Sequence, residues 1–295
     1  WMVIICLIGF AVCFMGLQNG IEKISKVMMS ALLIIMVILA VHSVMMEGAG
    51  EGIRFYLIPD FQKIKEAGVG NVVFAALSQS FFTLSIGIGA MLIFGSYLDK
   101  SRSLTGEAVS ITVLDTFVAL TAGFIIIPAC FSYNLDVGAG PSLLFVTLPT
   151  ILQDIPLGRL FAIILYLAMI FAGISSLQNM FEAVAESLLH KFPKLSRTAV
   201  LGIICALCLG AGLFMEPISK WGPWMDLVSI YIIPIGATLG AISWFYVMKK
   251  DELLDAVNTG SGKKHGALWY NAGRYIYVPM AVILCCVALF MNIAF

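Results

Sequence analysis

The chain has 295 residues, of which 61% are hydrophobic and only 12% are charged. A soluble domain is nearer half apolar and a quarter charged, so this composition excludes a soluble enzyme and a disordered segment. Seventeen basic residues balance seventeen acidic ones, which leaves no net charge to attract nucleic acid. With a mean hydropathy of +1.01, the sequence predicts a polytopic membrane protein.

Eight apolar stretches are long enough to cross a hydrocarbon core of about 30 Å, which takes about 20 helical residues. In chain order they are residues 1–18, 27–46, 72–97, 108–131, 157–189, 198–214, 224–248 and 274–295. A backbone in lipid must satisfy its own hydrogen bonds, and these runs are too long and continuous for barrel strands. We therefore expect an all-α protein with eight transmembrane helices.

Basic residues are divided unequally between alternate loops. The richer set holds Lys23, Lys26, Lys100, Arg102, Lys191, Lys194, Arg197, Lys249, Lys250, Lys263, Lys264 and Arg274, and the poorer set holds Arg54, Lys63, Lys65, Arg159 and Lys220. The positive-inside rule places the richer set in the cytoplasm. The membrane expected is the cell inner (plasma) membrane, and residue 1 is expected on its extracellular side. Residue 1 lies in an apolar run without an initiator Met or a signal peptide, so we expect a fragment.

The sequence carries no motif of hydrolytic or metal chemistry. Its seven cysteines lie in apolar runs, where they are expected to pack as small apolar residues. The three histidines are scattered, and neither H-E-x-x-H nor G-x-S-x-G occurs. We expect no enzyme activity.

Small and polar residues interrupt the stretch 72–97 near its middle, at Thr83, Ser85, Gly87 and Gly89. Two glycines in one turn weaken a helix by about 1 kcal/mol each relative to alanine. One interpretation is a helix broken at mid-membrane, whose freed backbone groups face a ligand. The other is close packing of helices through small residues.

Two acidic residues stand within or at the edge of later spans. Asp115 lies inside 108–131, where a carboxylate requires a cation, either a basic side chain or a bound ion. The sequence offers no basic residue at a comparable depth. Asp226, at the outer end of 224–248, is either interfacial or part of an outer gate, and Gly236 and Gly240 in the same span have the spacing of close helix packing.

A polar stripe follows the stretch 157–189, because Ser175, Asn179, Glu182 and Glu186 repeat at helical spacing. Its upper end, Ser175 and Ser176, lies near the middle of the span. These hydroxyls either bond back to the carbonyl four residues earlier or face a ligand. The lower end is expected to line a cytoplasmic vestibule.

Together these features resemble the neurotransmitter:sodium symporter family, specifically its bacterial sodium-dependent amino-acid transporters of the LeuT fold. Four motifs in order carry the resemblance: Gly20-Ile-Glu-Lys-Ile-Ser-Lys26, the segment Gln79–Gly89, Gly138-Ala-Gly-Pro-Ser-Leu-Leu-Phe145, and Phe171-Ala-Gly-Ile-Ser-Ser176. The resemblance covers essentially the whole chain. It implies that the eight stretches correspond to helices four to eleven of that fold, with the first three helices missing.

The same resemblance implies a division of the chain. Residues 1–46 would be the last two helices of the first repeat, 47–71 an extracellular loop and 72–248 the second five-helix repeat. This repeat would contain a broken helix near 83–89 and an extracellular re-entrant loop at 132–156. A cytoplasmic loop, 249–273, and an additional helix, 274–295, would follow.

Site residues are implied position by position. Phe82 resembles an aromatic lid over the substrate, and the substrate-binding positions are Phe82, Ser85, Ile88, Ser176 and Met180. The sodium positions are Thr83 and Asp115 for one ion and the Ala172 carbonyl, Ser175 and Ser176 for the other, all hard oxygen ligands. The gate positions are Tyr97, Asp226 and Glu186, where Glu186 would replace the usual acid because His190 stands in its place.

The function implied is symport of a neutral, hydrophobic or aromatic amino acid with two sodium ions by alternating access. Phe82, Ile88 and Met180 are apolar, which favours such a substrate. Asp115 stands where many relatives have Asn, and Ala119 stands where chloride-dependent relatives have a hydroxyl, so we expect no chloride. The fragment alone is not expected to transport. The partners expected are the amino acid, sodium and the lipid bilayer, without nucleic acid.

The alternative is an ion channel or a non-transporting membrane scaffold of the same fold. A channel would require a pore lined by repeated rings of residues, and the sequence shows no such pattern.

Overall fold

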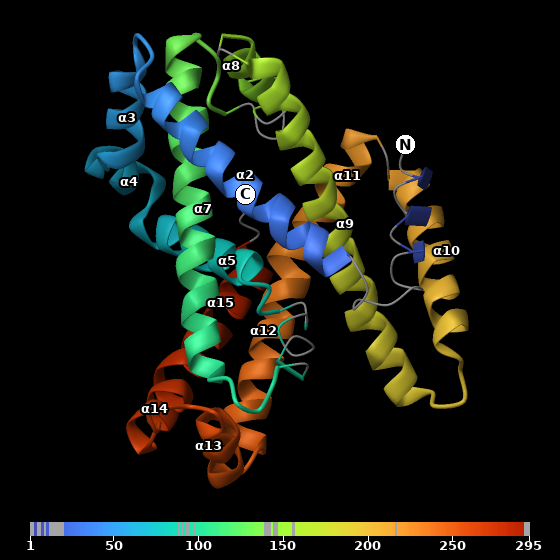
Figure 1. Ribbon diagram of the computed structural model, residues 1–295. Helices are drawn as coiled ribbons and strands as arrows, with labels where there is room; N and C mark the ends of the chain where they lie inside the picture. Colours follow the sequence, from blue (N-terminus) through green and yellow to red (C-terminus); the bar gives the residue numbers. More distant parts are fainter. Residues whose placement is uncertain are drawn as a thin grey trace. The chain divides into compact units, whose positions relative to one another are not determined.

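The computed structural model describes residues 3–4, 7–8, 10–11, 21–87, 89, 91, 95–96, 98–138, 143, 147–154, 157–215 and 217–291. Its elements are all helical, and the described residues contain no strand (Figure 1). The elements are α2 (Ile21–Val44), α3 (Ala49–Leu57), α4 (Phe61–Ala67), α5 (Val69–Thr83), α7 (Leu104–Ser132), α8 (Leu148–Asp154), α9 (Gly158–Lys191), α10 (Arg197–Met215), α11 (Ile218–Asp226), η2 (Leu227–Ile232), α12 (Ile233–Ile242), η3 (Ser243–Val247), α13 (Lys250–Asn258), α14 (Ala267–Ala272), η4 (Gly273–Tyr277) and α15 (Val278–Met291). The predicted all-α fold class is confirmed.

Five helices in the described residues are long and apolar enough to cross a membrane. They are Leu104–Ser132, Gly158–Lys191, Arg197–Met215, Lys220–Val247 and Ala267–Phe290. The pair Met29–Val44 and Ala49–Leu57 is bent by 113° and makes a sixth if it is counted as one broken span. Most of the predicted stretch 1–18 lies outside the described residues, and α5 ends partway through 72–97, so the number eight stays a prediction.

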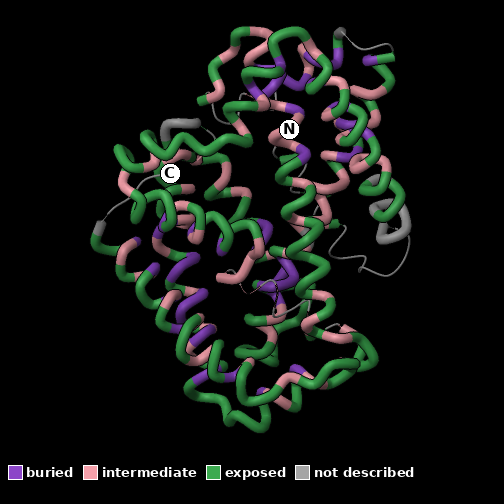
Figure 2. The backbone as a smooth tube through the Cα atoms, turned by 90° about the vertical axis from the view of Figure 1, so that its left-hand side faces the viewer, coloured by how far each residue is buried: buried purple, intermediate pink, exposed green. Residues whose placement is uncertain are grey.

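Most of the helical surface is exposed, as the green parts of the tube in Figure 2 show. Large apolar side chains are among the exposed ones, including Leu207 on α10, Leu239 on α12 and Ile163 on α9. Exposed apolar side chains on this scale are expected where the surroundings are lipid or other membrane helices. The protein is a multi-pass membrane protein.

The chain forms two compact units, and α4, α7, α9 and α10 contribute residues to both. The first unit comprises Trp1–Phe61, Thr116–Phe181 and Phe192–Cys205, and the second comprises Gln62–Asp115, Glu182–Lys191 and Ala206–Phe295. In the first unit, a core of Ile35, Leu39, Ile125, Ala129, Leu148, Ile151, Leu152 and Leu165 joins α2, α7, α8 and α9. The α3 helix packs on α7, where the Tyr56 ring lies edge-on to Phe124 at 5.3 Å between centroids.

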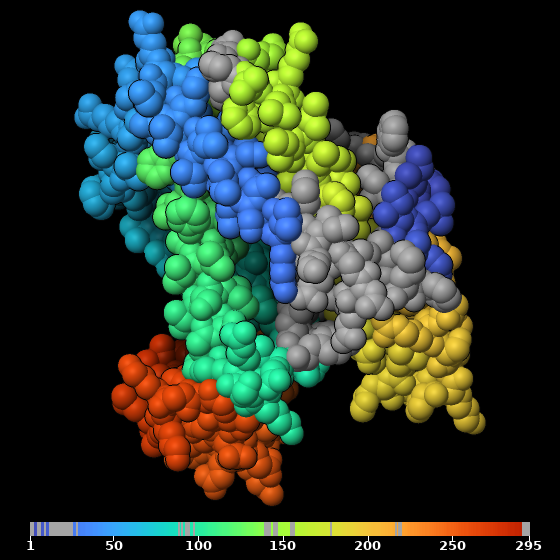
Figure 3. Space-filling view, viewed as in Figure 1, coloured from blue at the N-terminus to red at the C-terminus, as the bar shows by residue number. Residues whose placement is uncertain are grey.

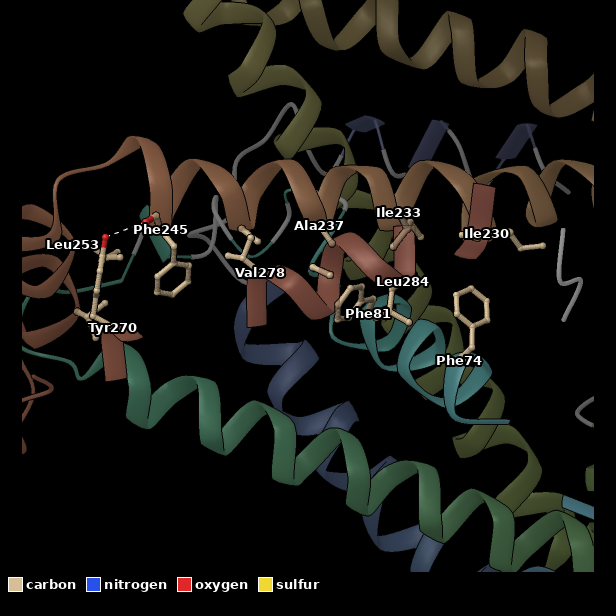
Figure 4. Packing of buried hydrophobic residues seen from close by; sticks show 14 residues of the cluster. Phe74, Phe81, Ile230, Ile233, Ala237, Phe245, Leu253, Tyr270, Val278 and Leu284 are labelled. Atoms are coloured by element: carbon tan, nitrogen blue, oxygen red, sulfur yellow. Dashed lines mark hydrogen bonds between the residues drawn. The ribbon is translucent and has the colours of Figure 1, made fainter. Parts of the chain in front are cut away.

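The core of the second unit joins α5, η2, α12, η3, α13 and α14 to α15 (Figure 4). Two hydrogen bonds between helices fix its register. The Thr238 hydroxyl on α12 donates to the carbonyl of Ala281 on α15 at 2.9 Å, and the Tyr270 hydroxyl donates to the Phe245 carbonyl at 3.0 Å. Because these polar groups are buried, each bond also removes the cost of an unsatisfied group.

The last candidate span begins earlier than the sequence predicted, at Ala267 rather than residue 274. The short helix α14 and the π-helical segment η4 lead into α15 without a break in the element order. The span therefore takes in Arg274, which the charge count had assigned to a cytoplasmic loop.

Candidate functional site

The helix α5 ends at Thr83, in the middle of the predicted stretch 72–97. The Ser85 amide donates to the Phe82 carbonyl at 3.0 Å, and the Ile86 amide donates to the Phe81 carbonyl at 3.1 Å, which closes the end of the helix with tight turns. Ser85 has a φ of 53°, which is uncommon for a residue with a side chain. The peptide groups that follow Thr83 therefore leave the regular helical pattern.

Gly87, just beyond the break, lies directly against α12. A Cβ added to Gly87 would overlap the Ile233 carbonyl oxygen, and one added to Gly236 would overlap the carbonyl oxygen of Gly87. A Cβ at Gly240 would meet nothing within 4 Å. The helix therefore ends near the small residues, and the segment after it packs closely through glycine; that the freed backbone groups face a ligand stays a prediction. Of the predicted glycine pair, Gly236 makes the close contact.

A small pocket of about 180 Å³ brings two predicted positions together within the second unit. The described residues that line it are Ser78, Gln79, Phe82, Met225, Asp226 and Ser229. Phe82 comes from the last turn of α5 and Asp226 from the end of α11, and both are exposed. The pocket combines an aromatic ring, a carboxylate and polar side chains directly beside the helix break.

The two positions expected to hold the first sodium ion lie on different helices of the second unit. Thr83 is the last residue of α5, and its hydroxyl donates to the Ser80 carbonyl over 3.5 Å. Asp115 is half-buried on α7. No hydrogen bond among the described residues joins Thr83 to Asp115.

The positions expected to hold the second ion lie together on α9 in the first unit. The Ser175 hydroxyl donates to the Ala172 carbonyl, and the two oxygens are 3.0 Å apart. Ser176 and Met180, farther along the helix, are exposed. The bond of Ser175 runs to the carbonyl three residues earlier, not to the one four residues earlier that the back-bonding interpretation expected.

Only some of the expected gate positions lie among the described residues. Glu186 is half-buried near the end of α9, four residues before the exposed His190. Glu182, one turn earlier on the same polar stripe, is only 4% exposed. Ile88 and Tyr97 lie outside the described residues.

Two features were missed by the sequence reasoning. Gly236 packs against the backbone of Gly87. The spacing of glycines in a sequence can indicate close packing, but it does not show which residue the glycine contacts. Arg274 was counted as a loop residue. The apolar residues Ala267 to Tyr270 before it were the signal that the span starts earlier.

The chain is similar to known proteins over most of its length. The model of the "Sodium:neurotransmitter symporter family" matches residues 1–294. The sodium-dependent transporter YhdH of Bacillus subtilis is 35% identical over 286 residues, which cover 91% of this chain and 61% of that protein. The sodium- and chloride-dependent glycine transporter 2 of Xenopus laevis is 29% identical over 273 residues, which cover 85% of this chain and 34% of that protein.

Among solved structures, the crystal structure of MhsT in complex with L-phenylalanine superimposes with a TM-score of 0.84 at 31% identity. The match covers 98% of this chain and 67% of MhsT. The fold is therefore that of the LeuT-like transporters. The chain spans 61% of the length of the Bacillus relative.

Proposed function

Because this chain belongs to the sodium:neurotransmitter symporter family, we propose that the protein carries a neutral amino acid across the membrane together with sodium. The observation that carries the proposal is the end of α5 at Thr83 beside the pocket that Phe82 and Asp226 line. A helix broken inside a membrane protein places unpaired backbone groups where only a polar ligand or water can satisfy them.

The substrate is a hydrophobic or aromatic amino acid. The C-terminal end of α5 carries partial negative charge, which favours a cation such as sodium or the substrate ammonium group. Phe82 lies in the last turn of that helix and is 36% exposed, so its ring is available to cover a ligand. The complex of MhsT with L-phenylalanine, at a TM-score of 0.84, supports an aromatic substrate.

Sodium is bound by oxygen atoms at two places. Thr83 and Asp115 serve the first ion, and the fixed charge of Asp115 offsets the ion's charge in a low-dielectric setting. The Ala172 carbonyl with the hydroxyls of Ser175 and Ser176 serves the second. The 3.0 Å between the Ser175 and Ala172 oxygens lets one ion contact both, provided that the hydroxyl hydrogen turns away from the carbonyl.

Transport proceeds by alternating access. Sodium and the amino acid together favour the conformation in which Phe82 and Asp226 close the outer pocket, because a ligand shifts a conformational equilibrium by its differential affinity. Loss of sodium from Ser175 and Ser176 then favours opening toward the cytoplasm, where Glu186 acts as a gate residue in place of His190.

Chloride is not required. Ala119 has no hydroxyl with which to bind the anion, and it lies one helical turn from the carboxylate of Asp115. That carboxylate supplies a fixed negative charge of its own. The Xenopus relative is named as chloride-dependent, so we expect the two proteins to differ in their need for chloride.

The test is uptake of labelled amino acids by the full-length protein in proteoliposomes with an inward sodium gradient. Phenylalanine or leucine is expected to accumulate only with sodium, whether the counter-ion is chloride or gluconate. Asp115→Ala and Ser176→Ala are expected to abolish accumulation, while Ser187→Ala, the same serine change on the same helix, retains it.

Three results would overturn the proposal. They are uptake without sodium, competition by lysine or glutamate stronger than by leucine and tryptophan, and a conductance far above carrier turnover, which would indicate a channel.

A further inference from the structure

A cavity of about 840 Å³ lies in the second unit between the segment after the α5 break, α12 with η3, and α14 with α15. Its volume falls in the range of small-molecule ligand sites, about 300–1,000 Å³. The described residues that line it carry no charge, and they include Leu239, Trp244, Trp269, Ile276 and Met280. Such a cavity accepts an apolar chain.

The edges of the cavity carry exposed apolar side chains. Ile276 is 68% exposed and Leu239 is 61% exposed, and both lie in candidate membrane spans. Gly240 forms an open part of the wall, since a Cβ there would meet nothing within 4 Å. The cavity is therefore open at these edges, and an apolar chain can enter it there.

Arg274 stands beside the cavity, inside the candidate span Ala267–Phe290 and next to the lining residue Gly273. One guanidinium nitrogen, Nη1, donates to the Tyr270 hydroxyl at 3.3 Å. The guanidinium carbon lies 4.6 Å from the centre of the Tyr246 ring. The Nε atom is buried without a hydrogen-bond partner.

No carboxylate pairs with Arg274 among the described residues. An arginine at membrane depth is costly and requires an anion or an exit to the interface. A helical side chain points back toward the N-terminus of its helix, which directs Arg274 toward Tyr270, and Tyr270 is held in turn by the Phe245 carbonyl. In Figure 4, Phe245 and Tyr270 lie at one end of the core and Phe74 and Ile230 at the other.

One other basic side chain lies near Tyr270, and two more stand in the neighbouring segment of the sequence. The Lys250 amine lies 5.6 Å from the centre of the Tyr270 ring. Lys263 and Lys264, in the segment between α13 and α14, are exposed. The helix α13 also carries Asp251, Glu252 and Asp255, so the selection of an anion rests on Arg274 itself. Guanidinium groups bind phosphate through paired hydrogen bonds, and basic pockets between membrane helices bind anionic head groups.

We propose that this cavity is a binding site for an anionic phospholipid of the bilayer. The phosphate accepts hydrogen bonds from the guanidinium of Arg274, and one acyl chain fills the cavity past Ile276 toward Met280. The cavity alone would accept any lipid tail. The charge of Arg274, with Nε still to be satisfied, is what selects an anion.

The test is native mass spectrometry of the full-length protein in detergent, titrated with phosphatidylglycerol or with phosphatidylcholine of the same acyl chains. Phosphatidylglycerol is expected to bind at least about tenfold more tightly, the scale of one charge-assisted contact. Arg274→Gln is expected to remove this preference, because glutamine cannot carry the charge. Arg274→Lys keeps the charge but loses the paired donors of the guanidinium group, so it is expected to keep a reduced preference for phosphatidylglycerol.

A second variant probes the cavity separately from the charge. Gly240→Leu fills open space, so it is expected to weaken binding of both lipids while unfolding at an unchanged temperature. Lys220→Gln, at the start of the other span, is the matched control for charge removal and is expected to bind as the unchanged protein does. Added phosphatidylglycerol should raise the melting temperature of the unchanged protein and of Lys220→Gln, but not that of Arg274→Gln.

Equal affinity for the two lipids would overturn the proposal, and so would a preference that survives Arg274→Gln. Should Arg274→Gln fail to fold, the comparison of Arg274→Lys and Gly240→Leu with the unchanged protein decides instead. Binding that neither of these variants alters would place the lipid elsewhere.

Discussion

The Nε2 atom of His265 lies 3.0 Å from the hydroxyl oxygen of Thr105, although 160 residues separate them in sequence. Asn258 holds this histidine, since its side-chain oxygen accepts from the His265 amide at 2.6 Å and its amide nitrogen donates to the His265 carbonyl at 2.9 Å. In Figure 3 the start of α7 lies against the orange-red segments of α13 and α14. The segment that leads into α7 is thereby tied to the loop between α13 and α14.

Backbone contact reinforces this tie. Gly260 has a φ of 69°, and a Cβ there would meet the carbonyl oxygens of Arg102 and Lys100. The adjoining turn is held by Asp99, whose carboxylate accepts from the Ser101 amide at 2.8 Å. This hydrogen bond holds the pKa of the Asp99 carboxyl group below its usual range, so the carboxylate that accepts it is ionised at neutral pH.

Removing the tie is expected to destabilise the protein in two graded steps. His265→Ala loses one side-chain hydrogen bond and should cost about 1 kcal/mol. Gly260→Ala should cost about 1–3 kcal/mol, because it adds both backbone strain and overlap with two carbonyl groups. Thermal unfolding in detergent measures both, with the exposed His190→Ala as the control. A double-mutant cycle of His265→Ala with Thr105→Val that gives no coupling would contradict the contact.

The glycine contact after the break predicts opposite results for two alanines on one helix. Gly236→Ala overlaps the Gly87 carbonyl and should cost about 1–3 kcal/mol as overpacking. Gly240→Ala meets open space and should leave the melting temperature unchanged or slightly raised, because alanine favours a helix over glycine. Unfolding of the two variants side by side checks this. Equal destabilisation by both would show that general helix crowding, and not this contact, is responsible.

Phe82→Ala is expected to raise the KM for an aromatic amino acid about tenfold or more. The ring would cover the substrate, and burying a side chain of this size against a ligand is worth about 1.5–3 kcal/mol. Initial rates of sodium-driven uptake by the full-length protein give the KM. Phe290→Ala, which removes an 84% exposed ring on α15, is the control and should leave it unchanged. If the Phe82→Ala protein has the same KM for phenylalanine as the Phe290→Ala control, Phe82 is not part of the substrate site.

Ser175 distinguishes an ion ligand from a packing residue. Ser175→Ala removes the oxygen that lies 3.0 Å from the Ala172 carbonyl and should raise the sodium concentration for half-maximal uptake. Ser175→Thr keeps the hydroxyl and should stay close to the unchanged protein. Sodium titration of uptake at a fixed amino-acid concentration measures this. If alanine and threonine shift the sodium dependence equally, steric fit rather than the hydroxyl governs the position.

Sequence patterns predicted the helical class and the family well, because apolar length and motif order are local properties. Asp115 and Ser175 were singled out because polar groups stand out in an apolar run, and their roles stay predictions. The contact of Gly87 with Gly236 and that of His265 with Thr105 could not be predicted, since each depends on which helices meet in space. Arg274 was misplaced for another reason: apolar length marks the middle of a span more sharply than its ends.

The meeting of Gly87 and Gly236 bears on how this region can move. Where two side chains interlock, one helix passes another by steps, because each displacement must wait for rotamers to exchange. At Gly87 a peptide carbonyl rests on a backbone surface, and neither glycine has a rotamer to change. A small displacement of Gly87 along α12 therefore meets no barrier from a side chain of either glycine.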